Sequence, residues 1–246
     1  ILTTLVLTSE YLDPMYWSIN KALLESTYNA LQVASGFMLG ALSLTDRSRP
    51  QRVLQIGLGG GAQTNFLAQI PVNLLIDVVE LEPTVYEVAK KFFNLTENER
   101  VKVRIEDGVK FVERAVSENV IYDAILHDAC TNDVNEDVFC PAPVFLEPGV
   151  IGSMSKLVGS TGILALYIYC TESAQEVQQS KIESLYQKFF ITCFSLHFTE
   201  KQKMIFCSNR KDFDWEKQKV EILARLEGFD HSTGTKLHKL ISTLNK

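Results

Sequence analysis

The chain has 246 residues, of which 46% are hydrophobic and 22% charged, a balance typical of a globular protein rather than a disordered one. Its net charge of −6 argues against a broad nucleic-acid-binding surface, so we expect no nucleic-acid partner. The best apolar stretch, residues 34–44, falls short of the ~18 residues that a bilayer span needs, so we expect no membrane segment.

Residues 1–50 are predicted to be an N-terminal extension that packs on the core. The segment 2–7 has the pattern of a strand, and 20–44 is mostly helical in pattern. It carries no secretory signal and opens on Ile rather than Met, which fits a piece of a longer polypeptide. Its aromatic residues favour core or interface packing over a lid on a binding site; they are Tyr11, Tyr16, Trp17 and Tyr28.

From residue 51 onward, apolar runs of strand length alternate with amphipathic stretches of helix length. Strands are predicted at 52–56, 74–81, 101–105, 122–127 and 162–170, and helices at 62–68, 83–93, 109–116, 144–158 and 173–189. The segments 191–196 and 202–207 are predicted to close the sheet as an antiparallel hairpin, and weaker helices follow at 214–226 and 230–246. The pattern predicts one α/β domain over 51–246, with a doubly wound, mostly parallel, Rossmann-like sheet.

Glycines and two acidic residues follow consecutive predicted strands. Gly57, Gly59, Gly60 and Gly61 form a turn between the first strand and its helix, where glycine lets the backbone approach a ligand closely. Glu80 ends the second strand, where a carboxylate can accept hydrogen bonds from both hydroxyls of a ribose. Asp107 and Gly108 follow the third strand, where a carboxylate can accept a hydrogen bond from the exocyclic amine of adenine. Because these strand ends share one edge of the sheet, the three features together predict a nucleoside cofactor.

Each feature alone has an ordinary structural explanation, a tight turn, a solvated strand end or a helix cap. The spacing of Gly57, Gly59 and Ala62 also satisfies the dinucleotide fingerprint. A dehydrogenase is therefore an alternative, ranked last because the chain has no evident second substrate domain.

Four motifs in order resemble the spermidine synthase-like group of S-adenosylmethionine-dependent transferases, which have the class I methyltransferase fold. They are 53–61 (VLQIGLGGG), 79–83 (VELEP), 106–108 (EDG) and 122–128 (YDAILHD), and the resemblance covers about 31–207. Within that group the segment Cys140–Pro143 is similar to the C-terminal domain of the dual methyltransferases that modify elongation factor 1-alpha.

The resemblance implies roles for individual residues. Gly57, Gly59 and Gly61 would lie beside the methionine part of S-adenosylmethionine, Glu80 would bind the ribose, and Asp107 with Gly108 would bind the adenine. Asp128 falls where the polyamine synthases carry an aspartate that faces the reacting amine, so it is the candidate catalytic residue. The chemistry requires no metal.

Departures from the polyamine synthases favour a different acceptor. Those enzymes have an acidic residue inside the glycine turn, a Tyr-Gln pair ahead of it and Ser-Ser-Asp-Pro after the aspartate. This chain has only glycines at 59–61, Leu31 before Gln32, and ACTNDV at 129–134. We therefore predict a methyltransferase that acts on an amine, of a protein or a small molecule. A polyamine aminopropyltransferase and a non-catalytic methyltransferase-fold assembly domain remain alternatives, and a homodimer stays open.

The remaining candidates favour structural roles. His127 lies within the fourth predicted strand, where packing is more frequent than catalysis. Cys130 has no cationic neighbour that would lower its thiol pKa. The five cysteines form no CxxC pair and no Cys/His metal spacing, which predicts a reducing compartment, a cytoplasmic location and no metal site.

Overall fold

The computed structural model describes residues 5–6, 18–171, 175–199 and 201–244. Its main sheet contains β3 (Gln51–Ile56), β4 (Leu74–Glu80), β5 (Val101–Ile105), β6 (Tyr122–His127), β7 (Val138–Cys140), β8 (Val158–Cys170), β9 (Thr192–Thr199) and β10 (Gln202–Ser208). The helices are α1 (Thr27–Met38), α2 (Ala62–Gln69), α3 (Pro83–Phe93), α4 (Gly108–Ser117), α5 (Pro148–Leu157), α6 (Gln175–Tyr186), α7 (Trp215–Thr233) and α8 (Leu237–Leu244), with a 3-10 turn η2 at Pro143–Leu146. A separate pair joins β1 (Leu5–Val6) to β2 (Ser18–Ile19).

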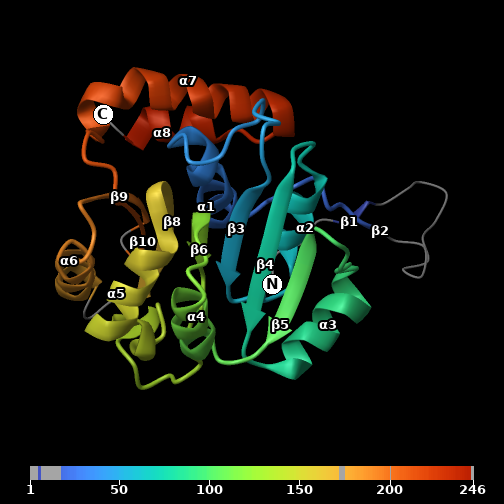
Figure 1. Cartoon of the computed structure of the whole chain (residues 1–246), viewed down its shortest axis with the longest axis horizontal. Helices are drawn as coiled ribbons and strands as arrows, with labels where there is room; N and C mark the ends of the chain where they lie inside the picture. Colours follow the sequence, from blue (N-terminus) through green and yellow to red (C-terminus); the bar gives the residue numbers. More distant parts are fainter. Residues whose placement is uncertain (1–4, 7–17, 172–174, 200, 245–246) are drawn as a thin grey trace.

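The strand order β5-β4-β3-β6-β8-β10-β9 confirms the doubly wound α/β fold predicted from the sequence (Figure 1). Strands β3 to β6 and β8 are parallel, and β10 with β9 closes the sheet as the expected antiparallel hairpin. Because β3 has β4 on one side and β6 on the other, the direction of winding reverses between β3 and β6. In open α/β sheets ligands bind at this point, beyond the carboxyl ends of the strands.

Two apolar clusters, one on each face of the sheet, form the core. Side chains of α1, α2 and α7 pack on one face, and those of α4, α5 and α6 on the other. Helix α1 is almost entirely buried, with Leu31, Val33 and Ala34 fully inaccessible. The division of the chain at residue 50 into an extension and a domain stays a prediction.

Several boundaries and pairings differ from those predicted. The segment 20–44, mostly helical in pattern, is α-helix only over Thr27–Met38, and α8 begins at Leu237 rather than at 230. Helix α5 begins only at Pro148, because residues 143–146 form the 3-10 turn first and proline is favoured in the first turn of a helix. Strand β8 begins at Val158, earlier than expected, and α7 extends to Thr233. The segment 138–140, which lies outside every predicted strand, pairs with β8 as the short strand β7.

The cysteines form two disulfides that the sequence did not predict, Cys130–Cys140 and Cys193–Cys207. Cys193 and Cys207 are directly opposite in the β9–β10 register, a proximity that sequence spacing does not reveal. Cys170 has a free, buried thiol, and burial raises its pKa to about 11. No helix among the described residues is long and apolar enough to cross a membrane.

Candidate functional site

The glycine turn is shaped by positions where a side chain has no room or no allowed conformation. Gly57 has φ +93°, and a Cβ atom there would lie 2.5 Å from the backbone oxygen of Asp128. The turn can therefore pass directly beside the end of β6. Gly59 also has positive φ, but a Cβ atom at Gly59 would meet nothing within 4 Å, so this part of the backbone faces open space.

Glu80 holds the turn from the end of β4. Its carboxylate is buried, and it accepts a 2.9 Å hydrogen bond from the backbone N–H of Leu58 through Oε2 and another 2.9 Å bond from that of Glu82 through Oε1. Each carboxylate oxygen has two lone pairs. Glu80 therefore fixes the turn and keeps acceptor capacity for a ligand at the same edge.

Asp107 is an N-cap of α4, since its Oδ1 accepts from the backbone N–H groups of Val109 at 2.8 Å and Lys110 at 3.4 Å. Its Oδ2 makes no hydrogen bond in the part of the chain that the structure describes, so the cap leaves one oxygen for a ligand. A Cβ atom at Gly108 would lie 3.0 Å from the ring of Phe145. The close packing of α4 against η2 thus explains this glycine without a ligand.

A cavity of about 160 Å³ lies over the glycine turn. It is lined by Tyr28, Asn29, Gln55, Leu58, Gly59, Gly60, Ala62, Gln63 and Asp128. Two of the predicted site residues, Gly59 and Asp128, therefore lie in one hollow. Glu80, Asp107 and Gly108 do not line it; Glu80 is one hydrogen bond away through Leu58, and Asp107 lies two residues past Ile105, the β5 partner of Glu80.

A network of buried amides places α1 above this cavity. Gln32 Nε2 donates to the backbone oxygens of His127 and Ala165, each at 2.9 Å, which ties α1 to the end of β6 and to the middle of β8. Gln63 Nε2 donates to Asn29 Oδ1 at 2.8 Å and to Gln32 Oε1 at 2.6 Å. Gln32 therefore has a structural role here, and it fixes the helical turn that carries Tyr28.

Tyr28 and Asp128 form the ionisable part of the cavity wall. Burial raises the pKa of Asp128 to about 7, and a hydrogen bond from the Tyr28 hydroxyl lowers it in part. Burial and the nearby Asp128 charge raise the pKa of Tyr28, so the phenol stays protonated. Its ring stacks on Tyr167 with centroids 4.3 Å apart. The sequence interpretation assigned Tyr28 to packing. Its position four residues before Gln32 places both side chains on one face of the helix, and this spacing was the signal that could have assigned Tyr28 to the site.

Two neighbouring polar groups are buried without hydrogen-bond partners among the described residues. Gln63 Oε1, beside the cavity, has no donor. Both ring nitrogens of His127 are also without partners, and its ring packs edge-on against Phe145 at 4.3 Å. Burial lowers the pKa of His127 to about 3, which makes this imidazole a poor base at neutral pH. Gln63 Oε1 is likewise inaccessible to solvent, although the residue lines the cavity.

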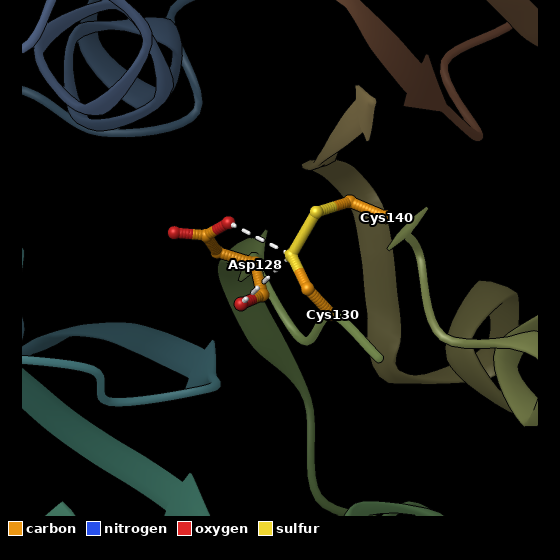
Figure 2. A group of neighbouring side chains, drawn as sticks. All are labelled: Asp128, Cys130 and Cys140. Carbon is orange, nitrogen blue, oxygen red and sulfur yellow. Dashed lines mark hydrogen bonds between the residues drawn. A yellow bond between two sulfur atoms is a disulfide. The ribbon is translucent and has the colours of Figure 1, made fainter. Parts of the chain in front are cut away.

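The Cys130–Cys140 disulfide closes the loop that follows Asp128 (Figure 2). Cys130 is exposed on this loop, whereas Cys140 is buried on β7. The disulfide therefore ties the loop to the sheet immediately beside the carboxylate.

A larger hollow of about 500 Å³ lies at the other end of the strands, between α4 and β5. Most of its charges are paired there: Asp77 accepts from Arg52 at 3.3 Å and from Tyr122 at 3.1 Å, and Arg114 pairs with Glu106 at 2.6 Å. It contains none of the predicted site residues, so we place the candidate site over the glycine turn.

Comparison with protein families gives a match over residues 34–214 to the spermine/spermidine synthase domain. Among curated proteins, the chain is 28% identical over 199 residues to an eEF1A lysine and N-terminal methyltransferase homolog of Drosophila melanogaster. It is 30% identical over 173 residues to the eEF1A lysine and N-terminal methyltransferase of Danio rerio. The matches cover 77% and 70% of this chain but only 29% and 25% of those proteins. The chain thus spans less than a third of the length of these relatives.

Solved structures support the same fold. Human methyltransferase-like protein 13 in complex with SAH aligns with a TM-score of 0.74 at 21% identity, covering 86% of this chain and 94% of that one. Spermidine synthase from Thermotoga maritima aligns with a TM-score of 0.58 at 16% identity, covering 85% and 75%. At these identities the likeness establishes the fold alone.

Proposed function

The chain belongs to the spermine/spermidine synthase family, and we propose that it is an S-adenosylmethionine-dependent methyltransferase that acts on an amine of a protein substrate. The observation that carries this proposal is the cavity over the glycine turn, in which Asp128 is the one carboxylate among the lining residues. The names of the eEF1A methyltransferase relatives support the same activity.

The proposed cofactor position follows the three strand ends. Glu80 would bind the ribose hydroxyls, Asp107 Oδ2 the adenine amine, and the turn at 57–61 would contact the methionine part. Leu81, directly after Glu80, is 62% exposed and would be available to pack against the adenine ring.

Two features of the turn favour S-adenosylmethionine over its decarboxylated form. Helix α2 has no side-chain cap at Gly61, so its first N–H groups are open to an anion such as a carboxylate. The glycines at 59–61 place no acidic residue there to repel it. Gln63, which lines the same cavity, would lie near the adjacent amino group.

The charge of the cavity favours a single amine over a polyamine. A polyamine carries several positive charges, and burying them requires several carboxylates. Among the residues that the structure describes, Asp128 is the one acidic residue that lines the cavity. An aliphatic amine that projects from a protein chain would match this one carboxylate.

The bound cofactor would supply an activated methyl group that an amine lone pair displaces in line. The role of this chain is to align the amine and to take its proton. Asp128, with a pKa near neutrality, can accept that proton at Oδ1 or Oδ2 and release it again. Tyr28 would orient the carboxylate through its hydroxyl group.

Isothermal titration with S-adenosylmethionine, its decarboxylated form and NAD tests the cofactor, and single-turnover methyl transfer to an amine-bearing protein tests the reaction. We expect binding of S-adenosylmethionine and methyl transfer that falls by about 10²- to 10⁴-fold in Asp128→Asn. Preference for the decarboxylated form would favour the aminopropyltransferase. Absence of binding by all three would favour a non-catalytic assembly domain.

We further propose a cytoplasmic location, supported by five scattered cysteines, an odd number with no CxxC pair. The two disulfides, Cys130–Cys140 and Cys193–Cys207, argue against it, because disulfides are rare in that compartment. Fractionation of cells that express the tagged chain tests it, and recovery from a secretory fraction would contradict it.

A further inference from the structure

Three potential metal ligands converge beside the candidate site. One carboxylate oxygen of Asp128 and the sulfurs of Cys130 and Cys140 all lie within 4.8 Å of one another (Figure 2). Cys130 Sγ is 3.8 Å from Asp128 Oδ1. Because a disulfide sulfur carries no hydrogen, Cys130 Sγ cannot donate to this oxygen, and both atoms have lone pairs. Such a pair of atoms can share a cation.

The spacing agrees with that of tetrahedral zinc. Zn–S bonds of ~2.3 Å and Zn–O bonds of ~2.1 Å at the tetrahedral angle place sulfur and oxygen about 3.6 Å apart and two sulfurs about 3.8 Å apart. The observed 3.8 Å between Cys130 Sγ and Asp128 Oδ1 is close to the first value. The two sulfurs, bonded to each other in the disulfide, must separate on reduction. Cys130 is exposed on its loop, so it has room to move.

We propose that, when this disulfide is reduced, Asp128, Cys130 and Cys140 form a binding site for a thiophilic divalent cation of the zinc class. Two thiolates and one carboxylate form a donor set that suits zinc better than magnesium or calcium. Three protein ligands leave the fourth position for water. The disulfide and the metal site exclude each other, because both use the same two sulfurs.

The reaction balances with a phosphine as reductant. The phosphine takes up the oxygen of one water molecule to become a phosphine oxide, and the S–S bond accepts two electrons and two protons to give two thiols. Binding of the cation then releases both thiol protons.

A bound cation would affect the proposed methyl transfer, and this consequence rests on the proposed function. The cation would neutralise the Asp128 carboxylate and occupy one of the two oxygens that could take the proton of the acceptor amine, so zinc should inhibit transfer competitively with the acceptor. A chelator should restore the activity. Binding itself requires neither cofactor nor acceptor, so it can be measured even if the proposed function is wrong.

The test is titration of the phosphine-reduced full chain, freed of reductant, with Zn²⁺ in competition with a chromogenic chelator. We expect one ion per reduced chain and none per oxidised chain. Co²⁺ as a spectroscopic probe should give the thiolate-to-metal absorption in the near ultraviolet. Absence of zinc binding by the reduced chain would overturn the proposal.

Variants identify the ligands. Cys130→Ser, at an exposed position, should abolish binding without unfolding the chain. Asp128→Asn should weaken binding by roughly tenfold or more, since even partners outside the ligand set are worth about 10- to 100-fold in affinity. The matched control is the double variant Cys193→Ser/Cys207→Ser, which removes the other disulfide and should bind zinc like the parent. Unchanged affinity in Cys130→Ser or Asp128→Asn would refute the three-ligand site.

Discussion

Glu80 has two roles that one substitution can separate. Its carboxylate accepts from the N–H groups of Leu58 and Glu82, and it is the proposed ribose ligand. In Glu80→Gln the amide NH₂ replaces one acceptor by a donor. We expect S-adenosylmethionine binding to weaken by roughly 10- to 100-fold, since a hydrogen bond to a charged group is worth about 1.5–3 kcal/mol. Calorimetric titration measures this change.

The control is Glu82→Gln, an exposed neighbour whose side chain makes no cap bond to α3. It should bind like the parent. We expect Glu80→Gln to lose on the order of 1 kcal/mol of unfolding free energy as well, because one buried N–H loses its acceptor. A folded Glu80→Gln chain with parental affinity would refute the ribose contact.

The pKa of Asp128 predicts how transfer depends on pH. The carboxylate form is the proton acceptor, and its pKa is about 7. The parent should therefore gain rate as pH rises to about 7, by up to about tenfold per unit, and this gain should then level off. The acceptor amine titrates as well, so the informative quantity is the single-turnover rate of the parent divided by that of Asp128→Asn. A ratio independent of pH between about 5 and 9 would contradict the role of Asp128.

The same raised pKa predicts a cost in stability. Folding raises the pKa of Asp128 from 3.8 to about 7, so the folded state holds a proton that the unfolded state has lost between these values. Stability of the parent relative to Asp128→Asn should therefore fall as pH rises from about 4 to 7 and stay constant above. At about pH 8 the variant should be more stable, on the order of 2 kcal/mol after allowance for partial exposure. Urea unfolding of the parent and of Asp128→Asn at about pH 4 and about pH 8 measures this difference. If the two proteins were equally stable at both pH values, the pKa of the Asp128 carboxyl group would be unperturbed.

At the scale of elements, Gly57 and Gly59 have similar backbone conformations and different surroundings. A Cβ atom at Gly57 would overlap the backbone of Asp128, whereas one at Gly59 would meet nothing within 4 Å. Gly57→Ala should therefore cost about 2 kcal/mol or more in unfolding free energy, and Gly59→Ala about 1 kcal/mol, mainly from positive φ.

In ligand binding the order should reverse: Gly59→Ala, the variant that loses less stability, should lose more affinity for the cofactor. Gly59→Ala places a methyl group in the space assigned to the cofactor, so it should remain folded and lose affinity. Thermal unfolding and calorimetric titration of both variants check this contrast. A Gly59→Ala chain with parental affinity would show that no ligand passes over this turn.

The local parts of this fold could be predicted from the sequence, and the distant contacts could not. The period of apolar residues and the glycine turn place β3, α2 and β4 nearly at their observed ends, because these signals lie within a few neighbouring residues. The contact of Tyr28 with Asp128 joins residues 100 positions apart and depends on how α1 crosses the sheet. The pairing of Cys130 with Cys140 depends on β7, a strand of three residues with no period of its own.

At the scale of the molecule, the winding reversal between β3 and β6 gathers the candidate site from separate segments. Tyr28 comes from α1, the glycines follow β3, and Asp128 follows β6. The side-chain amides of Gln32 and Gln63 hold these segments together by hydrogen bonds. We therefore attribute the buried polar residues of α1 to the site rather than to the core.

The last prediction concerns the role of the N-terminal segment, residues 1–20. The described part of this segment is a two-stranded pair, β1 with β2, of two residues per strand, and so small a sheet is marginal by itself in water. The aromatic residues Tyr11, Tyr16 and Trp17, assigned to packing from the sequence, lie outside the described residues. We expect the segment to serve subunit contact in a homodimer or to cover the bound substrate.

Removal of residues 1–20 should convert a dimer into a monomer in sedimentation velocity, or reduce turnover while cofactor affinity stays constant. Affinity should not change, because α1 begins at Thr27 and the truncation leaves Tyr28 and the amide network intact. Loss of cofactor binding would instead place the segment in the nucleoside site. Sedimentation and turnover that both match the full chain would exclude the two proposed roles.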